Sequence, residues 1–174
     1  MVIQYLNPEA DCLVPIKGYQ LSVDLNRQPR LGLVINKIVD CDRFMSAVGA
    51  ELLEAVPHLK IIKFDTGTIT FADPELIDKI AAECDVAICA IGHCGSCTAG
   101  TVKDGIALIE KNCPSVALVT EHFWEQAEIL ARSLGWPDAP RVKLPYPVWG
   151  ADDKTMEMTA YAAAKQILQV LDSR

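Results

Sequence analysis

Short β-branched runs alternate with segments of helical period from Arg30 onward, and this alternation limits the fold more than any other feature of the sequence. Parallel strands need a crossover connection, which is usually a helix, so the pattern is typical of a parallel sheet covered by helices on both faces. We predict the α/β class, with a single doubly wound, flavodoxin-like, five-stranded parallel sheet in the order 2-1-3-4-5. The expected strands are residues 31–36, 59–65, 85–92, 115–121 and 141–147.

The expected helices lie between these strands and after the last of them. Phe44, Val48 and Leu52 recur four residues apart, which puts them on one face of a helix. The next helix begins at Asp73 and Pro74, because an Asp side chain caps a helix start and proline fits the first turn. The expected helices are near residues 42–56, from 73 through at least 81, from about 102 to a close near 112, 124–135 and 153–171.

Chain length and composition indicate one domain preceded by an arm. With 174 residues, 51% of them hydrophobic, the chain can bury one core and is too short for a second. Residues 30–174 make up the predicted α/β domain. Residues 1–29 are apolar without a clear period, so we expect an N-terminal arm that packs on the site edge or on a partner subunit. Such an arm favours a homodimer.

Charge and hydropathy patterns narrow the class of partner. The net charge of −7, with 16 scattered Lys and Arg residues, argues against nucleic acid, which needs a basic face. No apolar run approaches the roughly 20 residues that span a bilayer, and no signal-peptide pattern is present, so we expect a cytoplasmic protein without membrane association. Seven cysteines, an odd number, argue against a disulfide scaffold. A small-molecule substrate is the expected partner.

The carboxyl ends of the strands are the expected binding edge. In doubly wound sheets, ligands bind where the strand order reverses, here between the first and third strands. The third strand ends at Gly92, and Cys94 and Cys97 follow at once in the motif GHCGSCT. Polar residues that follow other strands are expected at the same edge: Asn36, Lys37, Thr120, Glu121, His122 and Tyr146.

Two thiols at this edge indicate a chemical role for the cysteine pair. The alternative is a structural role, as two small residues in a tight turn. Cys97 is expected at or just before a helix start, where free N–H groups and the helix dipole stabilise an anion, so its thiol should ionise readily. Cys94 is expected in the turn. There Gly95 permits an unusual backbone conformation that can bring the sulfurs within disulfide distance or turn both toward one substrate. Three other cysteines lie in apolar runs and are expected in the core: Cys84, Cys89 and Cys113.

The candidate catalytic residues are Cys94, Cys97, His93 and His122. As an imidazolium, His93 can lower the pKa of the adjacent Cys94, although adjacent side chains often diverge. His122 follows a strand that should neighbour the third, so it can transfer protons to a sulfur or a substrate, or face solvent at a helix start. Glu121 can orient His122 or cap that helix.

The candidate substrate-binding residues offer hydrogen bonds, charge or an apolar wall. Ser96 and Thr98 can bind an oxyanion through their hydroxyl groups, or cap the helix that follows the motif. Lys37 can attract a carboxylate, and Tyr146 can line the pocket or pack on a neighbouring subunit. The full set is Asn36, Lys37, Gly95, Ser96, Thr98, Thr120, Glu121 and Tyr146.

Metals and nucleotide cofactors find little support in the sequence. Structural zinc sites usually take two closely spaced ligand pairs, whereas one CxxC is present here. His93 and His122 could complete a set of ligands, but His93 directly adjoins Cys94. No GxGxxG follows the first strand and no P-loop occurs. We therefore expect no metal and no cofactor.

The motif GHCGSCT, together with PSVALVTEHF, resembles the UGSC family of proteins and selenoproteins. Three further segments are similar to that family: LNPEA near the amino end, LGLVINK at the first strand and VKLPYPV at the last. The resemblance covers most of the chain, from Leu6 to about Gly150. In selenocysteine-bearing members the selenium residue comes first in the motif, at the position of Cys94. The resemblance implies that Cys94 is the reactive residue and Cys97 its partner.

These observations predict a small-molecule enzyme that uses the motif from Cys94 to Cys97 for thiol redox or covalent nucleophilic catalysis. Two alternatives remain. One is a cofactor-independent, cysteine-dependent lyase, isomerase or hydrolase. The other is a module that binds a metal or an anion without catalysis.

Overall fold

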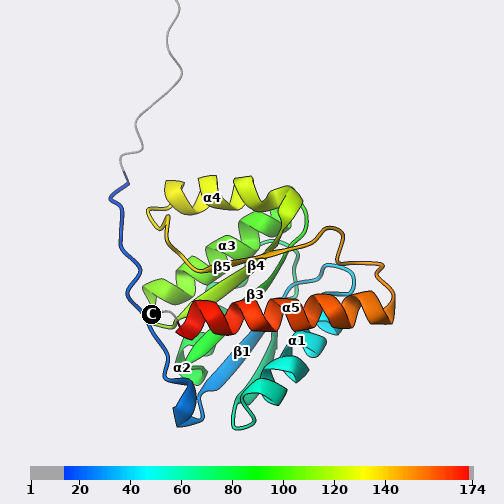
Figure 1. The fold of residues 1–174 in the computed structure, drawn as a ribbon. Coiled ribbons are helices and arrows are strands. Elements are labelled where there is room, and N and C mark those ends of the chain that lie inside the picture. Colours follow the sequence, from blue (N-terminus) through cyan, green and yellow to red (C-terminus); the bar gives the residue numbers. More distant parts are fainter. Residues whose placement is uncertain (1–13, 173–174) are drawn as a thin grey trace, which may run out of the picture.

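Residues 14–172, which the computed structural model describes, contain one five-stranded parallel sheet (Figure 1). The strands are β1 (Arg30–Ile35), β2 (Lys60–Asp65), β3 (Val86–Gly92), β4 (Ser115–Thr120) and β5 (Arg141–Leu144). Their order is β2-β1-β3-β4-β5, and every neighbouring pair runs parallel. The predicted doubly wound, flavodoxin-like sheet is confirmed.

Helices cover both faces of this sheet. They are α1 (Cys41–Ala55), α2 (Pro74–Glu83), α3 (Gly95–Glu110), α4 (Trp124–Ser133) and α5 (Asp153–Asp172), with 3-10 turns η1 (Leu25–Arg27) and η2 (Glu121–Phe123). On one face α1 packs beside α5, and on the other α3 lies between α2 and α4 (Figure 1). In the described part of the chain, no helix has the length and apolar character needed to cross a membrane.

The central strands are buried on both faces, which explains their continuous apolar sequences. Every residue of β3 and β4 is buried. Leu33 and Ile88 belong to the core under α1 and α5, whereas Val34 and Cys89 belong to the core under α2 and α3. Burial of each large side chain contributes roughly 1.5–3 kcal/mol relative to exposure.

Three strands end earlier than predicted, β1 by one residue at Ile35, and the helix after the cysteine motif begins earlier. β4 ends at Thr120 because Glu121 begins η2. β5 ends at Leu144, since Pro145 and Pro147 lack the N–H donors that strand pairing needs. The helix after the cysteine motif begins at Gly95, so that Cys97 lies within its first turn.

The described part of the arm, residues 14–29, lies away from the predicted site edge. The main-chain N–H of Lys17 donates to Gly135 O at 2.7 Å, and its Nζ binds Glu110 at 2.8 Å. Both partners lie at the far ends of α4 and α3 from the cysteine motif. Tyr19 and Leu21 pack against the core between these helices. The prediction that the arm packs on the site edge is therefore wrong for these residues, because their apolar side chains find cover at the opposite edge.

The other half of that prediction, packing on a partner subunit, stays a prediction. Residues 1–13 of the arm, which include the LNPEA segment, lie outside the described residues.

Candidate functional site

The polar residues after β1, β3 and β4 meet at the carboxyl edge of the sheet because the strands run parallel. Asn36 Nδ2 donates to Ile91 O at 3.1 Å, and Thr120 Oγ1 donates to Gly92 O at 2.9 Å. Both side chains are buried, at 5% and 0% exposure. They hold the end of β3 in place, so we assign them a bracing role and do not propose them as substrate ligands.

Cys94 and Cys97 form a disulfide in the first turn of α3, with their Cα atoms 5.3 Å apart. Cys94 is the N-cap residue, and its sulfur accepts the N–H of Cys97 at 3.2 Å. Cys94 is partly exposed, whereas Cys97 is fully buried. Cys97 was expected at or just before the helix start, but the helix begins earlier and places the Cys94 sulfur over its end. The dipole and the N–H group therefore favour a thiolate at Cys94 when the pair is reduced.

The exposed side of the cysteine turn carries Gly95 and Ser96. Ser96 Oγ lies 3.5 Å from Cys94 Sγ, within hydrogen-bond distance for sulfur. Gln126 of α4 donates from Nε2 to Gly95 O at 2.8 Å and ties the two helices together. Gly95 is the first helical residue and has no positive φ, so the predicted unusual backbone conformation is not found there. The sequence offered no signal for Gln126, which is 31 residues from its partner.

Close packing behind the turn depends on Gly92 and Gly100. A Cβ atom at Gly92 would lie 3.0 Å from Thr98 Oγ1 and 3.2 Å from Thr98 Cα. A Cβ atom at Gly100 would lie 1.8 Å from Thr70 O, in the loop after β2. Thr98 is fully buried by this packing. Among the described residues its hydroxyl group has no hydrogen-bond partner, and it is closed to a substrate in this conformation.

His93 is buried beneath the segment that follows β5. It is 1% exposed, and its Nε2 accepts the N–H of Val148 at 3.0 Å. The ring centroid lies 4.6 Å from that of Tyr146 and 4.1 Å from that of Trp149. Burial lowers the pKa of His93, and the nearby His122 lowers it further, while its own carbonyl acts in the other direction. The imidazolium predicted to activate Cys94 is therefore disfavoured, because the charged form would be desolvated.

The neutral His93 ring has a defined tautomer. Since Nε2 accepts a hydrogen bond, the proton resides on Nδ1. This Nδ1 is buried and has no hydrogen-bond partner in the described structure. His93 therefore anchors the segment from Tyr146 to Trp149 over the end of β3.

His122 and Tyr146 complete an aromatic cluster made of His93, His122, Phe123, Tyr146 and Trp149. The rings of His122 and Tyr146 stack with centroids 4.1 Å apart. Glu121 accepts the main-chain N–H of Tyr146 at 3.4 Å, so it holds this segment instead of orienting His122. His122 is exposed at the surface of the cluster.

Lys37 belongs to a neighbouring pocket of about 300 Å³ at the ends of β1 and β2, which Asn36 also lines. The charges in this pocket are paired: Lys37 with Asp65, and Lys63 with Asp42. The contact with Lys37 also holds the pKa of Asp65 below its usual value. A carboxylate substrate would have to displace Asp65 from Lys37.

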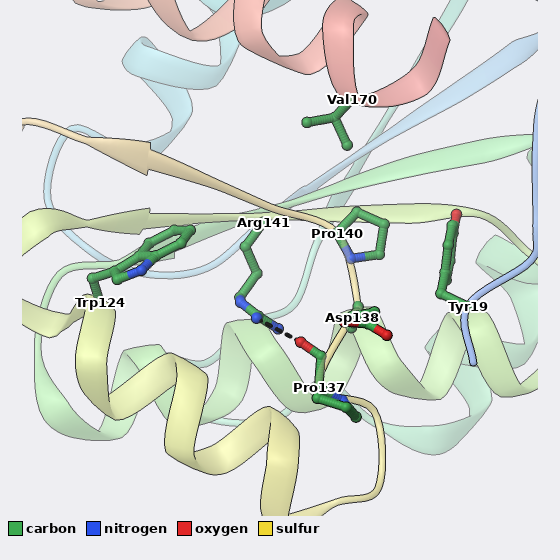
Figure 2. A pocket seen from close by; sticks show the side chains of 8 residues that line it. Tyr19, Trp124, Pro137, Asp138, Pro140, Arg141 and Val170 are labelled. Atoms are coloured by element: carbon green, nitrogen blue, oxygen red, sulfur yellow. Dashed lines mark hydrogen bonds between the residues drawn. The ribbon is translucent and has the colours of Figure 1, made fainter. Parts of the chain in front are cut away.

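Metal ligands do not gather in the described part of the chain. Within residues 14–172, no three His, Cys, Asp or Glu side chains come together in a way that could hold a metal ion. The pocket shown in Figure 2, of about 420 Å³, lies beside the start of β5 and includes no residue of the cysteine turn.

Comparisons with solved structures return flavodoxin-like chains. A diflavin flavoprotein A3 from Nostoc sp. is 12% identical, with a TM-score of 0.44 over 83% of this chain and 97% of that chain. The flavodoxin-like domain of a Synechococcus sp. protein is 12% identical, with a TM-score of 0.41 over 80% of this chain and 99% of that chain. No curated protein is significantly similar.

The family comparison covers nearly the whole chain. A family model described as the UGSC family matches residues 17–173. The matched residues include all five strands and the cysteine motif. This chain belongs to the UGSC family.

Proposed function

We propose that this protein is an enzyme that uses Cys94 and Cys97 for two-electron thiol–disulfide chemistry on a small molecule. The observation that carries the proposal is the disulfide between a partly exposed cysteine and a buried one, at the start of α3 and at the ligand edge of the sheet. In this arrangement the exposed sulfur can attack a substrate disulfide, and the buried sulfur can then resolve the mixed disulfide that forms.

In the reduced protein, Cys94 is the attacking atom. Its thiolate is stabilised by the N–H of Cys97 and by the start of α3. It attacks a substrate disulfide, breaks the S–S bond and forms a mixed disulfide, while the released sulfur takes up a proton. The Cys97 thiol then loses its proton and attacks Cys94 Sγ, which closes the protein disulfide and releases the second substrate sulfur as a thiol.

The electrons in this cycle balance. Two protein thiols lose two electrons and two protons, and one substrate disulfide becomes two thiols. A low-molecular-weight dithiol restores the protein by the reverse exchange. The exposed His122 and the Ser96 hydroxyl lie on the side from which protons can be exchanged with solvent.

Trapping of the intermediate tests the proposal. We expect the reduced Cys97→Ser protein to form a stable mixed disulfide on Cys94 with bis(hydroxyethyl) disulfide, detected by peptide mass spectrometry. Cys94→Ser should form no adduct on Cys97, because Cys97 is fully buried. Cys113→Ala serves as the control, since both motif cysteines remain and turnover should be retained. Equal adduct formation on Cys97 in Cys94→Ser would overturn the assignment of the attacking residue.

The same experiment separates the alternative chemistries. The helix start that stabilises a Cys94 thiolate also suits covalent non-redox catalysis, as in a cysteine-dependent lyase, isomerase or hydrolase. An adduct from a substrate that resists dithiothreitol would indicate a thioether or thioester and favour that class. Protection of both thiols from titration that a chelator reverses would favour a metal-binding module.

We also propose that the protein is a cytoplasmic homodimer. Met158 and Tyr161 on α5 are 65% and 59% exposed and offer apolar area for a second subunit. The free thiols at Cys41, Cys84, Cys89 and Cys113 are compatible with a reducing compartment. Light scattering at micromolar concentration tests the dimer, which a 19 kDa particle would exclude.

A further inference from the structure

A second pocket lies beside the edge strand β5, away from the cysteine chemistry. It has a volume of about 420 Å³, and its walls come from the arm, the start of α4 and the segment that leads into β5 (Figure 2). The residues that matter here are Tyr19, Trp124, Pro137, Asp138, Pro140 and Arg141. Apart from Arg141 and Asp138, the residues that line the pocket are aromatic or apolar, although polar atoms supply most of its exposed surface.

Arg141 is the pocket residue whose hydrogen-bond donors are not all paired in the described structure. Its Nη2 donates to Pro137 O at 2.9 Å, the contact drawn in Figure 2. Its Nε and Nη1 are buried and have no hydrogen-bond partner in the described structure. Burial lowers the pKa of Arg141, with Glu128 and Asp138 acting in the other direction from a distance. A guanidinium with covered, unpaired donors costs free energy, and an acceptor supplied by a ligand would offset that cost.

Trp124 supplies a flat surface between two cations. The Arg141 guanidinium carbon lies 5.9 Å from the centroid of the indole ring, and Lys143 Nζ lies 4.7 Å from it. Arg141 and Lys143 are two residues apart on β5, so their side chains leave the same face of the strand. The positive charge and the apolar surface are therefore adjacent.

We propose that this pocket binds a small organic carboxylate with an apolar body. The carboxylate pairs with the Arg141 guanidinium, whose planar fork of donors matches two carboxylate oxygens. The apolar body lies against Trp124 and the rings of Pro137 and Pro140. Because Nε and Nη1 are covered, the Arg141 side chain turns from Pro137 O toward the ligand on binding. This site does not depend on the thiol chemistry, since its lining contains no cysteine.

Titration with benzoate, followed by calorimetry and by the NMR signals of the indole N–H groups, tests the proposal. We expect saturable binding that shifts the Trp124 signal and leaves that of Trp149 in place. Arg141→Met should weaken binding about 10- to 100-fold, the range for a charge-assisted hydrogen bond. The benzoate affinity of Arg141→Lys should lie between those of wild type and Arg141→Met, because lysine keeps the positive charge but lacks the planar fork of donors. Arg132→Met, an exposed arginine of α4 outside the pocket, is the matched control and should bind as wild type does.

Three results would overturn the proposal. The first is equal benzoate affinity in wild type and Arg141→Met, with both folded by circular dichroism. The second is inorganic phosphate binding as tightly as benzoate, which would indicate an oxyanion site without use of the apolar wall. The third is the absence of a Trp124 shift at saturation.

A second variant keeps the test decisive if Arg141→Met does not fold. Trp124→Leu should weaken benzoate severalfold and leave acetate, which has almost no apolar body, unchanged. Equal loss for both ligands would contradict the role of the wall. Cys94→Ser should bind benzoate with unchanged affinity. A failure of the carboxylate-site proposal can therefore be distinguished from a failure of the proposed thiol chemistry.

Discussion

The cysteines at the two ends of α3 differ in nearly every property that controls a thiol. At its start, Cys94 is partly exposed, and its sulfur accepts a main-chain N–H. Just beyond its end, Cys113 is 2% exposed, and its thiol donates to Cys84 O at 3.8 Å. Burial raises the pKa of Cys113 to about 12 and that of Cys84 to about 11.

The difference follows from the direction of the helix. In a parallel sheet, each crossover helix begins at the carboxyl edge and ends at the amino edge. The free N–H groups of α3 therefore lie at the ligand edge, where an anion is stabilised. Carbonyl groups and core side chains surround the other end, and there a cysteine acts as a small apolar residue. The prediction that Cys84, Cys89 and Cys113 lie in the core is confirmed.

Alkylation rates should show the largest contrast between the two ends. In the reduced protein at pH 7, we expect iodoacetamide to label Cys94 at least about 1,000-fold faster than Cys113. Only the thiolate form reacts, and burial disfavours the thiolate of Cys113. Mass spectrometry of the two peptides over time measures the ratio. Protein unfolded in urea is the control, in which the rates should converge. Similar rates in the folded protein would contradict the comparison.

Packing should also differ along α3. Gly100→Ala should destabilise the protein by about 3 kcal/mol, because its Cβ would overlap the main chain at Thr70. Gly95→Ala is the matched control, since its Cβ would meet only the Gln126 side chain, at 3.8 Å. Urea unfolding measures the free energy of unfolding of both variants. A tolerated Gly100→Ala would show that the loop after β2 can move away from the helix.

Asp104 tests how burial in the middle of α3 affects an acid. Burial raises its pKa to about 6, although the Ala72 N–H, which it accepts, opposes this. The folded pKa lies above the unfolded value, so the folded state holds the proton more tightly and stability falls as pH rises from about 4 through 6. Asp104→Asn should remove this loss, which amounts to about 3 kcal/mol. Urea unfolding at several pH values checks it, and identical pH profiles would contradict it.

Ser96 should give the smallest effect. Its hydroxyl lies 3.5 Å from Cys94 Sγ and can donate to the thiolate from an exposed position. Ser96→Ala should slow alkylation of Cys94 about twofold, the effect of one weak exposed hydrogen bond. A tenfold or larger loss would show that Ser96 does more than solvate the sulfur. The Cys113 rate in the same sample is the internal control.

The predicted strands, helices and strand order agree with the structure. The order of the sheet followed from β-branched runs and helical spacing, which are properties of neighbouring residues. The placement of Cys94 and Cys97 at the ligand edge followed from their position after β3. Strand ends were less well predicted at β5, although Pro145 and Pro147 carried the signal.

Predictions that depended on distant residues did not agree. His93 was a candidate imidazolium beside Cys94, yet the segment from Tyr146 to Trp149, more than fifty residues away, buries it, and burial lowers its pKa. Gln126 was missed because its hydrogen bond to Gly95 O joins two helices. Residues 14–29 of the arm lie at the edge opposite to the predicted one, since nothing in their own sequence indicates where apolar cover is available.

The sequence by itself determined the strand order, the apolar core and the edge at which the cysteine pair lies, because strand and helix periods and the handedness of crossovers are local properties. The tertiary structure alone decided which sulfur receives the helix N–H, which histidine is buried with a lowered pKa and, among the described residues, which arginine keeps two unpaired donors. Those outcomes depend on burial and on hydrogen bonds between residues far apart in the chain, and the free energy of a charge changes with both.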